Sequence, residues 1–303
     1  MHTYFLGIDG GGSKCRASLC TEDGHIVGRG ISGTANPFQS VRRTIESITA
    51  SVAAAFADAG LDEGHLKATH AGVGLAGVDL PALYRKIADW PHGFASMHLT
   101  TDLEIACYGA HNGPNGAVIV VGTGSGAFVG VGGQRRTYGA HGFTFGDTAS
   151  GAWLGHQAVR AVLLAEDGLG PSTALAAVLE EIAGGRGGNI VESMRTSTPR
   201  DFAKLAPAVF DAAGDGDAVA VDIVGEGAAY LDRIADRLWA YDSPRMSLLG
   251  GLRELYVSYL SPTTLERLSP PAAQPDVGAL LYVRGKVLGD DRRGVDASAG
   301  VTG

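Results

Sequence analysis

Short apolar runs, separated by turns rich in glycine and charged residues, occur in the same order in both halves of the chain. They predict strands over residues 4–9, 14–20, 25–29, 68–75 and 97–101 in the first half, and over 117–121, 127–131 and 246–249 in the second. Apolar residues at three- and four-residue spacing predict helices over 36–60, 80–89, 103–111, 151–165, 172–183, 200–213, 217–241 and 277–287. Strands followed by helices, twice over, predict an α/β fold built by duplication.

The clearest break between the two halves is the segment 111–116 (HNGPNG), because proline, asparagine and glycine together favour a loop. We therefore expect an N-terminal domain over residues 1–112 and a C-terminal domain over 113–290. The Gly-, Asp- and Arg-rich tail, 291–303, is expected to be disordered.

The charge balance argues against a nucleic-acid binder, since 24 Lys and Arg face 32 Asp and Glu and give a formal net charge of -8. The longest apolar run, 117–121, is far too short to span a bilayer, and no targeting segment precedes the first strand. Cys15, Cys20 and Cys107 have neither metal-site nor C-x-x-C spacing. We expect a soluble, cytoplasmic protein with reduced thiols.

Glycine is the compositional outlier, with 46 residues gathered in a few tight clusters. Two of these, 10–13 and 122–126, each separate two apolar strands, one near the start of each half. Such turns allow backbone N–H groups to close on phosphate oxygens, although either turn alone could be a plain hairpin turn. The matched pair favours phosphate binding. A further G-x-G-x-x-G at 72–77 lacks an acidic residue about twenty positions on, so we interpret it as packing glycines.

Two carboxylates follow predicted strands. Asp9 lies beside the first glycine turn, where it could hold Mg²⁺ through water or cap the turn. Asp102 lies between a strand and a helix and is expected to be the helix N-cap.

Glu104 is expected to be an exposed helix residue. Asn36, followed by Pro37, has the pattern of an N-cap for the first long helix.

Three motifs resemble those of the sugar-kinase/Hsp70/actin superfamily. Residues 7–14 (GIDGGGSK) resemble its first phosphate motif, 120–125 (VVGTGS) its second, and 248–251 (LLGG) its adenosine motif. Within the superfamily the chain is similar to the BadF/BadG/BcrA/BcrD-type ATPase group, which includes N-acetylglucosamine kinase and bacterial glucosamine kinase. The similarity extends over about residues 4–287 and includes GDTASG at 146–151.

The resemblance implies a duplicated ribonuclease H-like (actin-like ATPase) fold of two domains around a cleft, with the last helix packing back on the N-terminal domain. It also implies ATP and Mg²⁺ as cofactors, with Asp9 holding the metal through water, and a homodimer. The residues that it assigns to ATP are Asp9, Gly10, Gly11, Gly12, Ser13, Lys14, Gly122, Thr123, Gly124, Gly250 and Gly251.

The implied activity is ATP-dependent phosphorylation of the 6-hydroxyl of an amino sugar, with N-acetyl-D-glucosamine the first candidate and glucosamine the alternative. Asp102 would be the catalytic base. The residues implied to bind the sugar are Asn36, Asp102, Ser125, Gly126, His141, Gly142 and Asp147. From the residues alone, Asp147 could equally close an Asx-turn, and His141 could be structural.

Two positions depart from the group's pattern. His141 stands where N-acetylglucosamine kinases tend to have an aromatic residue, and Thr148 stands where the group has Glu in a GDEGS-like stretch. Both leave the preferred 2-substituent of the sugar open.

Two other functions fit the sequence less well. An ATPase activator of a partner enzyme would need cysteines for an iron–sulfur cluster, which the spacing here does not suit. A sugar-sensing regulator would need a DNA-binding extension before the first strand.

Overall fold

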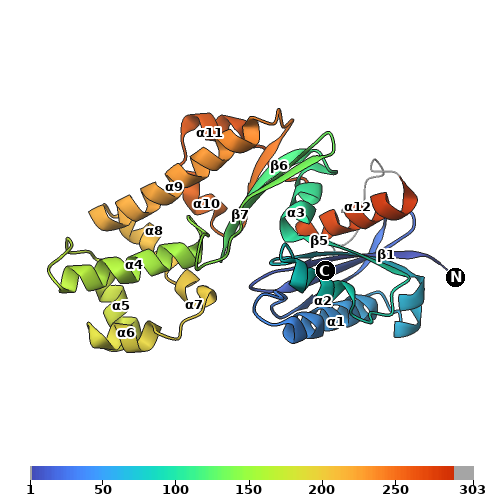
Figure 1. Ribbon diagram of the computed structural model, residues 1–303, viewed down its shortest axis with the longest axis horizontal. Coiled ribbons are helices and arrows are strands. Elements are labelled where there is room, and N and C mark those ends of the chain that lie inside the picture. The colour runs from blue at the N-terminus through green and yellow to red at the C-terminus, as the bar shows by residue number, and fades with distance from the viewer. Residues whose placement is uncertain (1, 290–303) are drawn as a thin grey trace.

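The same strand arrangement occurs twice in the computed structural model, which describes residues 2–289 (Figure 1). The first sheet has the order β3-β2-β1-β4-β5 and comprises β1 (Tyr4–Gly10), β2 (Cys15–Thr21), β3 (Ile26–Ser32), β4 (Thr69–Leu75) and β5 (Ser96–Thr101). The second has the order β8-β7-β6-β9 and comprises β6 (Gly116–Val121), β7 (Ser125–Val131), β8 (Gln134–Gly139) and β9 (Met246–Leu249). In each sheet an antiparallel three-stranded meander is extended by a parallel strand, β4 beside β1 and β9 beside β6. The predicted duplication is confirmed.

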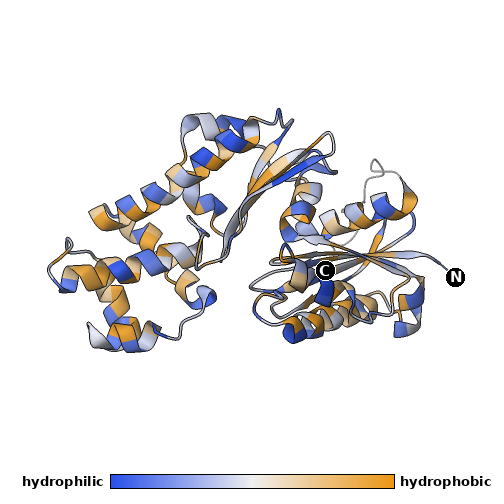
Figure 2. Ribbon diagram, viewed as in Figure 1, coloured by the Kyte–Doolittle hydropathy of each residue, from blue (hydrophilic) through white to orange (hydrophobic). Residues whose placement is uncertain are grey.

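Both faces of the first sheet are covered by helices, and β1 shows how the sequence allows this. Tyr4, Leu6 and Ile8 point to the face covered by α1 (Val41–Asp58), whereas Phe5 contacts α12 (Pro275–Leu288) on the other face. Because both faces are buried, β1 has no charged residue from Tyr4 to Ile8 and reaches its first carboxylate only at Asp9. In Figure 2 the ribbons of α1, α4 and α9 alternate between blue and orange along their length, as expected of helices with one buried face.

Glycines allow α12 to approach the first sheet and α3 (Asp102–His111) very closely. A Cβ on Gly7 would lie 2.1 Å from Asp276 O, and one on Gly72 would lie 2.4 Å from Ala279 O. A Cβ on Gly278 would lie 1.9 Å from Ile105 O of α3. The G-x-G-x-x-G at 72–77 therefore provides packing glycines, as predicted.

The largest apolar core lies between the second sheet and helices that follow it, chiefly α4, α8 and α9. The helices of this region are α4 (Gly151–Glu166), α5 (Leu175–Ala183), α6 (Gly188–Met194), α7 (Pro199–Ala203), α8 (Ala206–Gly214), α9 (Ala218–Trp239), α10 (Arg253–Tyr256) and α11 (Pro262–Arg267). The first half also contains α2 (Pro81–Ala88) and the 3₁₀ helix η1 (Glu63–Ala68).

Helix α3 connects the two sheets physically. Its residues Leu103, Ala106, Cys107 and Ala110 form an apolar cluster with Val118 of β6 and Phe128 of β7. Another side of α3 packs against α12. Figure 1 shows α3 and α12 side by side at the junction of the two halves.

Most predicted elements are confirmed, and the exceptions have local causes. The first long helix begins at Val41 and not at Asn36, because Ser40 Oγ accepts the Arg43 amide at 3.2 Å. Asn36 Oδ1 instead accepts the Phe38 amide at 3.0 Å and closes a separate turn. The helix predicted over 200–213 is split into α7 and α8, and Pro207, which has no N–H to donate, lies in the first turn of α8.

Strand β8 and helix α6 were not predicted, because neither has a clear apolar period. The predicted tail, 291–303, lies outside the described residues. Among residues 2–289 no helix is both long and apolar enough to cross a membrane.

The close crossing of α3 and α12 can be tested with one added methyl group. Gly278→Ala is expected to lower the free energy of unfolding by about 1 to 3 kcal/mol, because the new Cβ has no room. Gly225→Ala is the matched control, since Gly225 lies inside α9 with nothing within 4 Å of its Cβ position. The control should raise stability by about 0.5 to 1 kcal/mol through helix propensity. Urea unfolding measures both, and a Gly278→Ala protein as stable as the wild type would contradict the packing argument.

Candidate active site

The two glycine turns meet. The Ser13 hydroxyl lies 3.2 Å from the Thr123 hydroxyl, across 110 positions of sequence. The first turn connects β1 to β2 and is closed by the Gly11 amide, which donates to Lys14 O at 3.1 Å. The second connects β6 to β7, where the Gly122 amide donates to Gly124 O at 2.9 Å. Equivalent turns of the two sheets thus form one continuous polar surface.

The glycines of these turns are of two kinds. Gly10 and Gly124 are packed, since a Cβ on Gly10 would lie 2.4 Å from Leu75 Cδ2 and one on Gly124 would lie 2.9 Å from Asp147 Oδ2. Gly11, Gly12 and Gly122 have nothing within 4 Å of a Cβ and no positive φ. Neither crowding nor backbone conformation requires glycine at these three positions. Their bare backbone leaves room for a ligand to approach.

A third glycine turn lies beside the second. Gly250 has φ +99° and its Cβ position is 2.1 Å from Val121 O, so no side chain fits there. The Leu252 amide donates to the same carbonyl at 3.2 Å. Since Val121 directly precedes Gly122, the turn after β9 lies against the start of the second glycine turn. Gly251 has open space around it.

Asp102 is the first residue of α3. The helix N-cap is Thr101, whose Oγ1 accepts the Glu104 amide at 3.1 Å, so the prediction of Asp102 as N-cap is wrong. Asp102 Oδ1 accepts the Leu103 amide at 2.9 Å. Burial, together with the negative charges of Asp79 and Asp147, raises the pKa of Asp102 to about 6, against the opposing effect of the Leu103 amide.

Asp9 lies near the end of β1, paired with Arg16 of β2 and Gly74 of β4, directly before the first glycine turn. Burial raises its pKa to about 7, and the negative charges of Asp102 and Asp276 act in the same direction, while Arg16 and Lys14 oppose them. The carboxylate of Asp102 is thus close enough to disfavour the ionisation of Asp9. Paired carboxyls with raised pKa values are a frequent feature of active sites.

Asp147 is buried against the second glycine turn. Burial raises its pKa, whereas the Ser125 and Gly142 amides and the charge of the exposed His141 lower it. Asp147 has φ 56°, and the nearby Ala140 has φ 57°. Left-handed backbone at residues other than glycine is costly and clusters at functional sites.

The remaining predicted sugar ligands lie on both sides of the glycine turns. Ser125 begins β7 and donates to Thr148 O at 2.8 Å, and Gly126 follows it, with its Cβ position 2.9 Å from Ala140 Cβ. Asn36 lies in the first half, where the Ala35 amide donates to Gly11 O at 3.0 Å. Asn36 is therefore tied to the first glycine turn.

The sequence pattern of the BadF/BadG/BcrA/BcrD ATPase family matches residues 6–282. The chain belongs to this family. It is 33% identical over 279 residues to the glucosamine kinase GspK of Vibrio cholerae serotype O1, covering 92% of this chain and 95% of that protein. The match confirms the resemblance drawn from the glycine motifs.

Solved structures agree with this assignment. A Chromobacterium violaceum protein provisionally named an N-acetylglucosamine kinase superposes with a TM-score of 0.87 at 31% identity, over 93% of this chain and 99% of that chain. A ROK family glucokinase from Streptomyces griseus, solved with glucose and AMPPNP, has a TM-score of 0.55 at 21% identity, over 94% of this chain and 99% of that chain, and is similar in fold alone. The actin-like ATPase fold is thus confirmed for this BadF/BadG-type chain.

One residue of this family member was misjudged from sequence. Glu104 is buried, whereas exposure was predicted. Its Oε1 lies 2.6 Å from Arg135 Nη1 of β8, and its Oε2 accepts the Thr100 hydroxyl. The sequence did not reveal this ion pair, because Arg135 belongs to strand β8, which was not predicted. Glu104 ties the start of α3, and with it Asp102, to the second sheet.

Proposed function

We propose that this BadF/BadG-type ATPase is a kinase that transfers the γ-phosphoryl group of ATP to the 6-hydroxyl of an amino sugar. The observation that carries the proposal is the contact of the Ser13 and Thr123 hydroxyls, which joins two open glycine turns beside the carboxylates of Asp9 and Asp102. The similarity to a glucosamine kinase supports the choice of an amino sugar.

In this proposal the ATP phosphates lie between the two turns. Gly11, Gly12 and Gly122 offer bare backbone to the phosphate oxygens, and Ser13 and Thr123 offer hydroxyl donors. Lys14 contributes positive charge, while Gly10 and Gly124 give the turns their shape. The adenosine would lie along Gly250 and Gly251, adjacent to the second turn.

The residues present also fit a magnesium ion held through Asp9. Among residues 2–289 no group of three or more His, Cys, Asp or Glu side chains is arranged to hold a metal. Mg²⁺ commonly takes one or two protein carboxylates and completes its shell with water and substrate phosphates, so a single carboxylate beside a phosphate site is sufficient. When bound, the ion would screen the negative charge of the phosphates.

Asp102 acts as the general base. Its carboxylate accepts the proton of the sugar 6-hydroxyl while the hydroxyl oxygen bonds to the γ-phosphorus. The bond from that phosphorus to the β–γ bridging oxygen breaks, and ADP leaves with the electron pair. A carboxylate whose pKa is about 6 remains ionised near neutral pH and is a better proton acceptor than an ordinary Asp.

The sugar lies against both halves. Asn36 contributes an amide from the first half, and Asp147 accepts hydroxyl hydrogen bonds from the second. Ser125, Gly126 and Gly142 line the same region, with His141 at its exposed edge.

The 2-substituent has two candidates, each with its own support. The carboxylate of Asp147 lies within electrostatic reach of Asp102, and two carboxylates beside the sugar favour a positively charged 2-amine, as in glucosamine. N-acetylglucosamine is supported by the likeness to the Chromobacterium violaceum structure. Glucose has neither the charged amine nor the acetamido group, so neither argument supports it as the substrate.

An activator that passes electrons to a partner enzyme is less well supported. Cys15, Cys20 and Cys107 are buried, and burial raises their pKa values to about 11, 12 and 12. Buried thiols that resist ionisation are poorly suited to ligate a cluster as thiolates.

The proposed reaction is tested by sugar-dependent ADP release. Mg-ATP is incubated with glucosamine, N-acetylglucosamine or glucose at matched concentrations, and ADP is measured by a coupled assay. We expect release with an amino sugar well above release with glucose. Release that is independent of every sugar would contradict the kinase proposal and favour a partner-dependent ATPase.

The role of Asp102 is tested by Asp102→Asn, which preserves shape and removes basicity. Turnover is expected to fall by about 10²-fold or more, while the affinity for a nucleotide analogue, measured by calorimetry, is unchanged. Asp79→Asn removes a neighbouring carboxylate that is not in the proposed machinery and should retain turnover. Full activity in Asp102→Asn would remove Asp102 from the mechanism.

The raised pKa of Asp102 predicts the acid side of the pH profile. The base must be ionised, so kcat/KM should rise with pH and reach half its plateau near pH 6, the pKa of Asp102. Asp79→Asn should shift this midpoint to lower pH, because the Asp79 charge helps to raise the pKa of Asp102. N-acetylglucosamine suits the measurement, since its acetamido group does not titrate. Identical midpoints in wild type and Asp79→Asn would contradict the assignment.

A further inference from the structure

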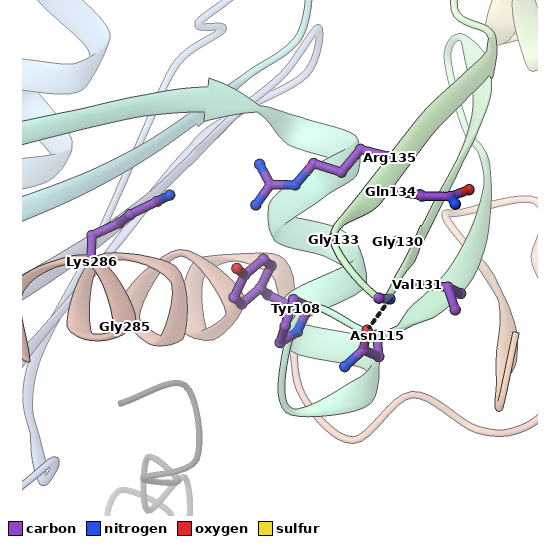
Figure 3. Close-up of a pocket in the computed structure, with 11 residues that line it drawn as sticks. Tyr108, Asn115, Gly130, Val131, Gly133, Gln134, Arg135, Gly285 and Lys286 are labelled. Carbon is purple, nitrogen blue, oxygen red and sulfur yellow. Dashed lines mark hydrogen bonds between the residues drawn. The ribbon is translucent and has the colours of Figure 1, made fainter. Parts of the chain in front are cut away.

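A cavity of about 390 Å³ lies at the junction of the two sheets, away from the residues proposed for ATP and sugar. Its walls come from α3, the turn between β7 and β8, the segment before β6, and α12. Tyr108, Asn115, Arg135 and Lys286 are the polar lining residues that matter here (Figure 3). The volume falls within the range of small-molecule sites in proteins.

Two cations face this cavity from opposite halves. Figure 3 shows the Arg135 guanidinium and the Lys286 ammonium extending toward the same space, with Tyr108 between them. Lys286 is exposed and stacks over Tyr282, with Nζ 5.4 Å from the ring centroid. Among residues 2–289 no carboxylate forms a salt bridge with Lys286.

Arg135 has hydrogen-bond donors that Glu104 does not use. Its Nη1 binds Glu104 Oε1 at 2.6 Å, and its side chain remains 44% exposed. A guanidinium has five N–H donors, so one carboxylate oxygen does not exhaust them. With Glu104 paired, Arg135 and Lys286 together leave a net charge of one positive unit in the cavity wall.

Neutral groups around the cations also suit an anion. Asn115 Oδ1 accepts the Gly132 amide at 3.0 Å, so the amide nitrogen of the same side chain is left to donate elsewhere. Gly130, Gly132, Gly133 and Gly285 carry no side chains into the space. A planar guanidinium with a nearby ammonium is the usual protein environment for phosphate oxygens.

We propose that this cavity is a second ligand site, which binds a phosphate monoester or inorganic phosphate through Arg135 and Lys286. Because its walls belong to both halves, a bound anion stabilises the relative placement of β8 and α12. The site is separate from the glycine turns, and its existence does not depend on the proposed kinase activity.

The effect on catalysis follows from the Glu104 contact and rests on the proposed function. Glu104 lies two residues after Asp102 and also accepts the Thr100 hydroxyl. An anion bound to the other donors of Arg135 shares the positive charge of the guanidinium, and so weakens its ion pair with Glu104, which holds the start of α3. Occupancy of the cavity is therefore coupled to the position of Asp102.

The site is tested with inorganic phosphate and calorimetry on the full chain. Lys286→Gln is expected to weaken phosphate binding by about tenfold, the loss of one charge-assisted hydrogen bond. Lys67→Gln is the matched control, because Lys67 is exposed on η1 and lies outside the cavity. Its affinity should equal that of the wild type. Arg135→Gln would leave Glu104 buried without its partner and could fail to fold, so Arg135→Lys, which keeps the charge, is the second variant.

The outcomes test the anion site and its coupling to Asp102 separately. Phosphate that binds wild type and Lys286→Gln equally well, or does not bind wild type at millimolar concentration, overturns the site. If phosphate changes turnover in wild type but not in Lys286→Gln, the coupling to Asp102 is supported. Equal turnover effects in the two proteins would overturn the coupling but not the site. If no sugar supports turnover, the binding measurement still decides whether the site exists.

Discussion

The structure depends on the close crossing of α12 with α3, where Gly278 leaves no space for a side chain against the Ile105 carbonyl. Through this crossing, a helix from the end of the described chain is fixed to the first sheet. The same α3 is packed on β6 and β7 of the second sheet. Any change in the spacing of these two helices would move one sheet relative to the other. The contact between Ser13 and Thr123, which spans both sheets, requires that this spacing be kept.

The chemistry of the site follows from what the fold buries. Asp9 belongs to β1, and Asp102 directly follows β5 as the first residue of α3. The two residues are brought close because β1 and β5 run in the same direction, with β4 between them, and so end on the same side of the first sheet. Burial raises the pKa values of both carboxyls, and negative charge adds to the effect, from Asp102 and Asp276 at Asp9 and from Asp79 and Asp147 at Asp102. Two buried carboxylates close together are unfavourable while both are ionised. A ligand that arrives with a cation reduces this repulsion, and the neighbouring glycine turns offer it backbone N–H groups. The site therefore suits an anionic ligand that carries a cation.

Much of this was accessible from sequence. All strands except β8 were predicted, because short apolar runs end at glycine or charge, and the two glycine turns were predicted as a pair. Which glycines pack, such as Gly10, and which face open space, such as Gly12, could not be predicted, since that depends on neighbours distant in sequence such as Leu75. Whether the expected residues bind ATP and sugar remains a prediction.

The misjudged residues have specific physical causes. Thr101 and Asp102 can both cap a helix, and the backbone conformation of Thr101, not a residue preference, decides between them. Glu104 was judged exposed because its partner, Arg135, lies in a strand whose sequence (QRRTYG) has little apolar alternation. Contacts between distant segments cannot be found from either segment alone.

The position of α12 has a consequence for how the protein is made. Phe5 emerges from the ribosome near the beginning of synthesis, yet its apolar partners Val277, Leu280 and Val283 are among the last described residues to appear. The part of the first sheet that α12 covers therefore stays exposed while nearly the whole second half is translated. Domains that are left incomplete during synthesis expose apolar surface that can aggregate. The nascent first half should depend on chaperones, or fold late, although it is the first part of the chain to be made.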